Sequence, residues 1–397
     1  MGPYHVSGKL LRPQFCSTLS MNASQEIERS LKQPSATIQK FLAVLQTRDN
    51  RALMSKLEAA QALTRRHFGR TMRLFAPLYV SNECINNCQY CGFSRDNPIL
   101  RTTLSRDEVV AEGQHLAREG FRQVLIVAGE HPRFVSNGYL ESCVRDLIDD
   151  FPSVALEVAP MEAEDYRPLV RAGAEALVVY QETYDREIYK TVHTSGPKKD
   201  YDWRLACPER AYQAGFRRIG IGALLGMAPW HSEALRLAAH LEYLQKRCWR
   251  AMFTISLPRL RPAAGCYEPP HPVSDADFVR LILAFRLAFP EVGIVLSTRE
   301  SPELRQALWS TAITHMSAGS HTEPGGYTGQ GKSRLHTTVR GREVENALSN
   351  GEATAQFEIA DHRSASEISR LLQADGLEPV WKDWQPFEPK EAACANS

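Results

Sequence analysis

The sequence predicts an α/β protein, a (β/α)8 TIM-type barrel with an N-terminal helical extension and a C-terminal extension. Two observations lead to this prediction: short apolar runs alternate with amphipathic segments from residue 74 onward, and the alternation repeats eight times. Parallel strands joined by helices form α/β sheets, and eight such units close a barrel. With 397 residues, 43% of them hydrophobic, the chain is long enough to bury the core of such a barrel.

Each expected element has a recognisable pattern. The expected strands are Leu74–Val80, Gln123–Ala128, Val154–Val158, Ala176–Tyr180, Arg218–Gly222, Met252–Leu257, Gly293–Ser297 and Ala312–Ser317. The expected helices are Arg106–Glu119, Gly138–Asp150, Glu164–Ala172, Pro208–Ala214, Ser232–Arg247, Asp275–Ala288, Pro302–Leu308 and, as the eighth, Ala365–Ala374. Ser105 precedes the first of these and has Glu108 three positions later, which is the pattern of a capping box.

The domain organisation follows from these elements. The expected divisions are a disordered tail at 1–21, an N-terminal helical extension at 22–73, the barrel at 74–324, and at 325–397 a flexible loop, a terminal helix and a docking C-terminal segment. Alternatively, the first residues come from an upstream start codon, and the true start lies near Met21. The docking segment is Val380–Trp384, which is too aromatic for a solvated tail.

Composition excludes several classes of function. A formal net charge of +1 gives no electrostatic reason to expect a nucleic acid or an anionic membrane as partner. No apolar run approaches the roughly 18 residues that a membrane helix needs. Nine cysteines, an odd number scattered along the chain, do not suggest a secreted disulfide framework. We therefore expect a cytoplasmic protein. The glycine-rich motifs that bind nucleotide phosphates are not found in the sequence.

Three cysteines follow the first expected strand: Cys84, Cys88 and Cys91. Three thiols on one short loop can bind a common metal centre, but they cannot supply four ligands. Structural zinc sites and ordinary cubane iron–sulfur clusters each take four protein ligands. The spacing therefore predicts a metal centre with one open position for a small molecule, unless a distant residue completes a zinc shell.

Polar residues also end most of the expected strands, on the rim where barrel enzymes have their active sites. Glu130 can hold an ammonium group or be a solvated turn residue. Glu157 lies inside an apolar strand, so it must be paired or bind a ligand. Glu182 can bind a diol or cap the next helix. Arg299 can hold a carboxylate with two hydrogen bonds or pair with a neighbouring glutamate.

The cysteine spacing within a barrel resembles the radical S-adenosylmethionine (SAM) superfamily. Tyr90 precedes the third cysteine, and Gly129-Glu130 stands where that superfamily has its amino-group motif. From Leu53 to Trp384 the chain is similar to the aromatic amino acid lyase branch, and most of all to the 2-iminoacetate synthase family of tyrosine lyases. The similar segments are Pro77–Tyr79, Cys91–Ser94, Gly129–His131, Tyr180–Tyr184, Pro258–Pro262, Ser297–Ser301, Pro324–Tyr327 and Val380–Trp384.

The resemblance implies a cofactor set and a role for each candidate residue. Cys84, Cys88 and Cys91 would hold a 4Fe-4S cluster that binds SAM at its open iron. The SAM-binding residues would be Gly129 and Glu130 at the amine, Glu157 and Glu182 at the ribose and sulfonium, and Tyr90 and Phe93 near the adenine. The residues that hold the substrate would be Tyr79, Ser256 and Arg299, the last at its carboxylate.

The implied reaction cleaves SAM to 5′-deoxyadenosine and methionine. It breaks the Cα–Cβ bond of L-tyrosine to give 2-iminoacetate (dehydroglycine) and 4-cresol, for the thiazole moiety of thiamine. The implied partners are a low-potential electron donor of the flavodoxin or ferredoxin type and the thiazole synthase.

Two alternatives stay open at this point: a radical lyase that acts on tryptophan, similar to the indolic acid synthases, and a non-catalytic metal-binding protein. A hydrogenase-maturation tyrosine lyase is disfavoured, because its second cluster needs C-terminal cysteines and only Cys394 lies beyond Cys266. Residues 328–356 are longer than the usual connection in this branch, and their role is not predicted.

Overall fold

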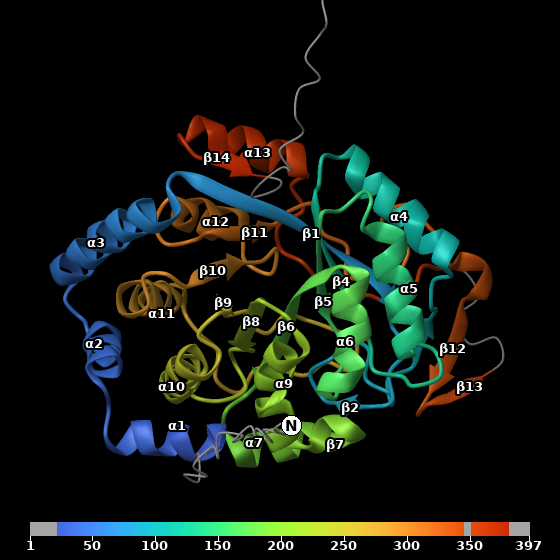
Figure 1. Ribbon diagram of the computed structural model, residues 1–397, viewed down its shortest axis with the longest axis horizontal. Coiled ribbons are helices and arrows are strands. Elements are labelled where there is room, and N and C mark those ends of the chain that lie inside the picture. The colour runs from blue at the N-terminus through green and yellow to red at the C-terminus, as the bar shows by residue number, and fades with distance from the viewer. Residues whose placement is uncertain (1–21, 345–350, 381–397) are drawn as a thin grey trace, which may run out of the picture.

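Eight parallel strands form a closed barrel in the computed structural model, which describes residues 22–344 and 351–380 (Figure 1). The barrel strands are β1 (Thr71–Ser81), β4 (Gln123–Ala128), β5 (Ser153–Glu157), β6 (Ala174–Glu182), β8 (Arg218–Ala223), β9 (Met252–Ser256), β10 (Gly293–Leu296) and β11 (His315–Ser317). Neighbours in the barrel follow chain order, and β11 pairs with β1 to close the ring. The predicted (β/α)8 fold is confirmed.

Helices cover the outside of the barrel. They are α4 (Arg106–Arg118), α5 (Asn137–Leu147), α6 (Ala163–Ala172), α9 (Cys207–Ala214), α10 (Trp230–Arg247), α11 (Asp275–Ala288), α12 (Pro302–Trp309) and α13 (Ala365–Ala374). The predicted capping box is present at α4, where the Ser105 side chain accepts from the backbone N–H of Glu108 and the Glu108 side chain accepts from that of Ser105. The predicted strand boundaries are furthest off in the first and last strands: the first starts at Thr71, and the last extends only over His315–Ser317.

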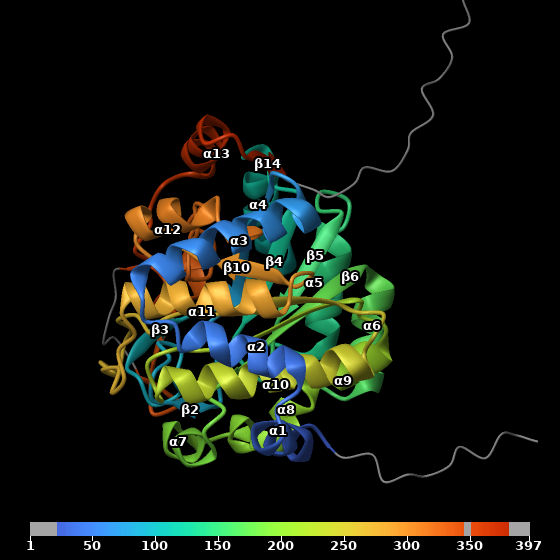
Figure 2. The same cartoon turned by 90° about the vertical axis from the view of Figure 1, so that its left-hand side faces the viewer.

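Three N-terminal helices pack against the barrel wall: α1 (Ala23–Lys32), α2 (Ala36–Leu45) and α3 (Asn50–Phe68). Figure 2 shows α2 beside α10 and α11 and α3 beside α11, and each of these three pairs is in contact. Phe41 of α2 is fully buried, and its ring centroid lies 4.8 Å from that of Phe285. Their apolar faces thus bury the outer side of α10 and α11. The division of the chain into segments at residues 73 and 324 stays a prediction.

An excursion between β6 and α9 was not predicted from the sequence. It comprises α7 (Arg186–Val192), β7 (His193–Ser195), a 3-10 turn (Pro197–Lys199) and α8 (Tyr201–Leu205). Strand β7 pairs with β2 (Asn87–Cys88), which lies within the cysteine loop. The excursion therefore brings residues 186–205 to the loop that carries the three thiols.

The described residues after β11 include short strands. Two of them, β12 (His336–Val339) and β13 (Arg342–Val344), form a small antiparallel sheet with β3 (Ile99–Arg101). Strand β14 (Glu378–Val380) adds to the start of β1. The predicted tail at 1–21 and most of the predicted docking segment Val380–Trp384 lie outside the described residues. Within the described ranges, no helix is long and apolar enough to cross a membrane.

Candidate active site

The three cysteines lie on the loop that follows β1 and line one cavity of about 610 Å³ at the carboxyl end of the barrel. Glu130, from the end of β4, and the rim carboxylates Glu157 and Glu182 line the same cavity. Burial raises the pKa of Cys88 and Cys91, so both thiols are protonated until a metal binds.

The three thiols of the cysteine loop all line one cavity. Among the residues that the structure describes, no group of three or more His, Cys, Asp and Glu side chains could hold one metal ion. Three thiols that line one cavity supply the protein ligands of a cubane cluster with one open iron. Gly129 allows β4 to approach this loop, because a Cβ there would lie 2.2 Å from the carbonyl oxygen of Glu83. The residues present thus fit a three-thiolate cluster.

Glu130 is held by the cysteine loop itself. The side-chain amide of Asn86 donates to Glu130 Oε2 over 2.6 Å, and its nitrogen also lies 3.8 Å from Cys84 Sγ. The backbone N–H of Ile85 donates to the Glu130 carbonyl oxygen over 2.8 Å. A carboxylate is thereby fixed beside the thiols, where it can accept from an ammonium group.

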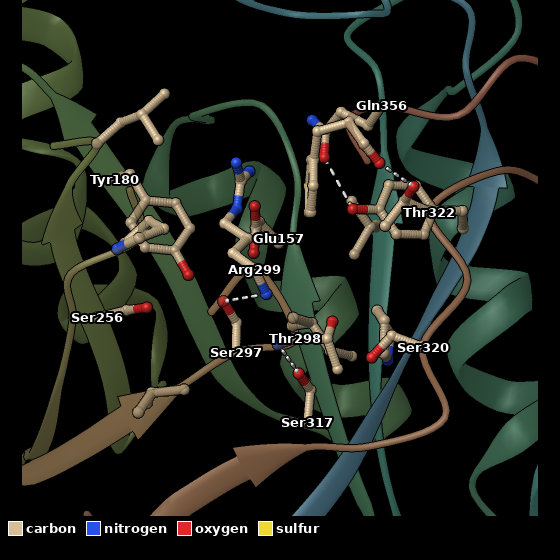
Figure 3. Close-up of a pocket in the computed structure, with 18 of the residues that line it drawn as sticks. Glu157, Tyr180, Ser256, Ser297, Thr298, Arg299, Ser317, Ser320, Thr322 and Gln356 are labelled. Carbon is tan, nitrogen blue, oxygen red and sulfur yellow. Dashed lines mark hydrogen bonds between the residues drawn. The ribbon is translucent and has the colours of Figure 1, made fainter. Parts of the chain in front are cut away.

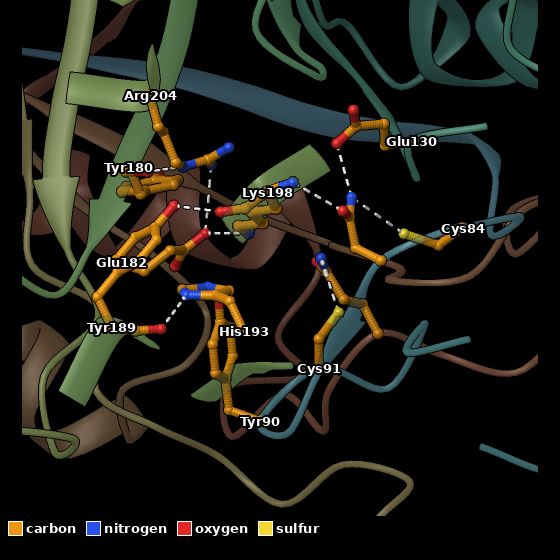
Figure 4. A network of polar contacts seen from close by, with 12 residues as sticks. Cys84, Tyr90, Cys91, Glu130, Tyr180, Glu182, Tyr189, His193, Lys198 and Arg204 are labelled. Carbon is orange, nitrogen blue, oxygen red and sulfur yellow. Dashed lines mark hydrogen bonds and ion pairs between the residues drawn. The ribbon is translucent and has the colours of Figure 1, made fainter. Parts of the chain in front are cut away.

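Glu182 is the centre of a buried charge network at the end of β6 (Figure 4). Its Oε1 lies 2.6 Å from Lys198 Nζ and 3.3 Å from Arg204 Nη2. Burial alone would raise the pKa of Glu182, but the two cations outweigh burial and lower it, so the carboxylate is ionised. The backbone φ of Glu182 is +71°, a strained value for a residue with a side chain. The cap of α7 is Asp185 rather than Glu182.

Tyr90 and Phe93 are both buried next to the cysteines. The Tyr90 hydroxyl lies 2.8 Å from His193 Nε2, and His193 Nδ1 lies 2.8 Å from the carbonyl oxygen of Tyr189. Burial lowers the pKa of His193 to about 3, so its ring is neutral and Nε2 accepts from Tyr90. The Phe93 ring makes an edge contact with Tyr79, with centroids 5.9 Å apart.

A second cavity, of about 940 Å³, lies further across the rim of the barrel (Figure 3). The predicted substrate residues Tyr79, Ser256 and Arg299 all line it. Burial lowers the pKa of Arg299 below that of an exposed arginine. Arg299 forms no ion pair with any residue of the described ranges, and Glu300 pairs with Arg259 instead, with Arg259 Nε 2.8 Å from Glu300 Oε2.

Glu157 lines both cavities. Burial, and then repulsion from Glu182, raise its pKa to about 7, although Arg299 acts in the opposite direction. A cationic ligand beside Glu157 would offset this shift, because a nearby opposite charge favours the ionised carboxylate.

Every predicted site residue therefore lies in one of two adjoining cavities, which share the residues Cys91, Val127, Glu157, Glu182, Lys198 and Gln356. Sequence reasoning missed Lys198, Arg204, Gln356 and Phe357. Lys198 and Arg204 lie in the unpredicted excursion, and Gln356 and Phe357 lie at the end of a segment whose role was not predicted. No local pattern distinguishes these four residues.

Comparisons with known proteins agree with this geometry. Residues 78–238 match the radical SAM superfamily, and residues 256–378 match the Biotin and Thiamin Synthesis associated domain. The chain is 37% identical over 363 residues to the 2-iminoacetate synthase of Escherichia coli (strain K12), which is 91% of each chain. It shares 37% identity over the same 91% of each chain with the 2-iminoacetate synthase of Salmonella typhimurium LT2.

Among solved structures, the chain is similar to HydG, a maturase of the FeFe-hydrogenase. The TM-score is 0.79 with 32% identity, over 91% of this chain and 76% of that one. HydG from Carboxydothermus hydrogenoformans gives a TM-score of 0.77 with 32% identity, over 90% of this chain and 79% of that one.

Proposed function

The chain belongs to the 2-iminoacetate synthase family of radical SAM enzymes, and on this premise we propose that it cleaves the Cα–Cβ bond of L-tyrosine. The products are 2-iminoacetate and 4-cresol, and the imine supplies the thiazole moiety of thiamine. One observation carries the proposal. A cavity lined by three thiols adjoins a cavity that contains the guanidinium of Arg299, which has no ion-pair partner among the described residues, and Glu157 and Glu182 line both.

Cys84, Cys88 and Cys91 would hold the 4Fe-4S cluster, with SAM at the open iron. When bound, this pair would supply the radical chemistry by which the Cα–Cβ bond of the substrate is broken. The protein orients the reactants and excludes water, while the radical chemistry belongs to the cofactor.

In the cofactor cavity, the roles of the three carboxylates are assigned from the positive charges of SAM that they would face. Glu130, fixed by Asn86, would accept from the methionine amine. Glu157 and Glu182 would face the ribose and the sulfonium, where negative charge stabilises a cation. Phe93 lines this cavity and Tyr90 lines the adjoining one, and both rings would supply buried aromatic surface against which an adenine could pack.

The roles of residues in the substrate cavity are assigned from the Arg299 guanidinium and from the aromatic side chains that line the same cavity. Arg299 would bind the tyrosine carboxylate, since a guanidinium can give two parallel hydrogen bonds to it. Tyr79 and Ser256 line the same cavity and would bind other parts of the substrate.

Two protein partners belong to the same proposal. The cluster needs an electron of low potential, which a flavodoxin-type or ferredoxin-type donor would supply. The product is an imine, and imines hydrolyse readily in water. Direct transfer to the thiazole synthase would therefore protect it.

Anaerobic reconstitution with iron and sulfide, followed by product analysis, tests the function. We expect 5′-deoxyadenosine, methionine and 4-cresol to form with tyrosine and a reductant. A lyase product from tryptophan but not from tyrosine would instead assign the tryptophan reaction. A protein that binds only zinc and cleaves no SAM would be the non-catalytic alternative.

A further inference from the structure

The segment 351–361, which we call the strap, lies over the rim of the barrel between the cysteine loop and β10. Its backbone is bonded at both ends: Thr354 N donates to the Leu100 carbonyl over 3.0 Å, and Ala360 N donates to the Thr298 carbonyl over 2.8 Å. In the middle, Gln356 N donates to the Thr322 carbonyl over 2.9 Å. The strap is therefore a fixed part of the cavity wall.

The strap meets the cysteine loop at Gly92. The Gly92 N–H donates to the Gln356 carbonyl over 3.0 Å. A Cβ on Gly92 would lie 2.5 Å from that carbonyl oxygen and 2.6 Å from the carbonyl oxygen of Ala355. Only glycine allows this approach, so the residue after Cys91 is matched to the strap.

The side chain of Gln356 reaches both cavities. Its Oε1 accepts from the Tyr79 hydroxyl over 2.7 Å, and its Nε2 lies 3.9 Å from Cys91 Sγ. A cysteine thiolate can only accept hydrogen bonds, so the amide nitrogen must face the sulfur when Cys91 binds iron. The Tyr79 hydroxyl then fixes the amide in this orientation by donating to its oxygen.

We propose that Gln356 is a positioning residue that makes the cluster easier to reduce by donating its amide N–H to the sulfur of Cys91, with Tyr79 holding the amide in place. Reduction adds negative charge to the cluster, and a donor at a ligand sulfur stabilises that charge. Hydrogen bonds to cluster sulfurs are among the factors that set reduction potentials. One side chain then joins the wall of the substrate cavity to a ligand of the cluster. This inference rests on the proposed function, because it takes Cys91 to be a ligand of the cluster.

The test is a redox titration of the reconstituted full-length protein, monitored by electron paramagnetic resonance without substrate. Gln356→Leu removes the donor without adding charge. We expect the ratio of reduced to oxidised cluster at a fixed potential to fall about tenfold, which is about 59 mV for a one-electron couple. Gln356→Glu should lower the ratio further, because a carboxylate adds negative charge. Tyr79→Phe should lower it by a smaller factor.

Gln181→Leu is the matched control, since Gln181 is a buried rim glutamine that donates to the carbonyl of Tyr201 over 3.3 Å and lines neither cavity. It should titrate like the wild type. A wild-type potential in Gln356→Leu would overturn the proposal, whatever the potential of Gln356→Glu, because a carboxylate lowers the potential by its charge alone. If Gln356→Leu takes up no cluster, Tyr79→Phe decides by the same criterion. A wild-type protein that takes up no cluster would contradict the proposed function, whereas an unchanged potential in loaded variants contradicts only the role of Gln356.

Discussion

The guanidinium carbon of Arg299 lies 3.3 Å from the ring centroid of Phe357, so an aromatic ring of the strap covers one face of the cation. Stacking of this kind leaves the N–H donors at the edge of the guanidinium available. The contact therefore holds a buried arginine at the cavity without using the donors that a carboxylate needs. It also explains how Arg299 is kept in place without an acidic partner among the described residues.

The first prediction concerns Arg299. Arg299→Ala should lower tyrosine-dependent formation of 4-cresol by about 100-fold or more, because a buried carboxylate loses its charged partner. Reductive cleavage of SAM should fall far less, since the thiols and the rim carboxylates are unchanged. Both products can be quantified in the same reaction by chromatography.

Phe357→Leu keeps the guanidinium and should lower 4-cresol formation by a smaller factor. Equal losses of 4-cresol and 5′-deoxyadenosine in Arg299→Ala would rule out a role at the substrate carboxylate.

The second prediction concerns the cysteines. Replacing Cys84, Cys88 or Cys91 by serine should abolish the cluster, because no fourth protein ligand is expected to compensate. The measurement is bound iron and acid-labile sulfide after anaerobic reconstitution. Cys266 is exposed, and it lines neither cavity, so Cys266→Ser should take up iron like the wild type. Normal iron and sulfide content in any of the three loop variants would remove that cysteine from the ligand set.

The third prediction is a pH dependence due to Glu157. Its pKa is raised to about 7 in the folded protein, whereas an unfolded glutamate titrates near 4.5. The folded state therefore binds more protons between these values, and the free energy of unfolding must fall as pH rises through this window. The full loss from this group is up to about 3 kcal/mol above pH 7. Glu157→Gln should remove it.

Denaturant unfolding of the cofactor-free protein at several pH values between 5 and 8 provides the measurement. Other buried groups also titrate: the pKa of Glu233 is raised to about 7, and that of His240 is lowered to about 3, both chiefly by burial. Since these groups are common to both proteins, the difference between wild type and Glu157→Gln isolates Glu157. The wild-type curve should fall relative to the variant curve as pH rises. Parallel curves would mean that Glu157 titrates normally.

The barrel and the thiol set could be predicted from sequence because both depend on local patterns. Alternating apolar runs define strands, and three closely spaced cysteines define a metal loop. Lys198 and Gln356 could not be predicted, since each reaches the site through a segment with no regular period. Lys198 follows a 3-residue strand pairing with the cysteine loop, and Gln356 lies in a strap held by backbone hydrogen bonds. Such placements depend on tertiary contacts that a linear pattern does not contain.

The last prediction tests the fit between Gly92 and the strap. Gly92→Ala places a methyl group against two strap carbonyls, so either the strap or the cysteine loop must shift. We expect a loss of about 1 to 3 kcal/mol in the free energy of unfolding, as for other overpacked sites. We also expect slower turnover of tyrosine, because the strap carries both Gln356 and Phe357.

Gly138→Ala is the matched control, because a Cβ there meets nothing within 4 Å. It should be neutral or slightly stabilising, since alanine favours a helix more than glycine does. If Gly92→Ala were as stable and as active as Gly138→Ala, the close approach of the strap to the cysteine loop would not be required for either folding or turnover.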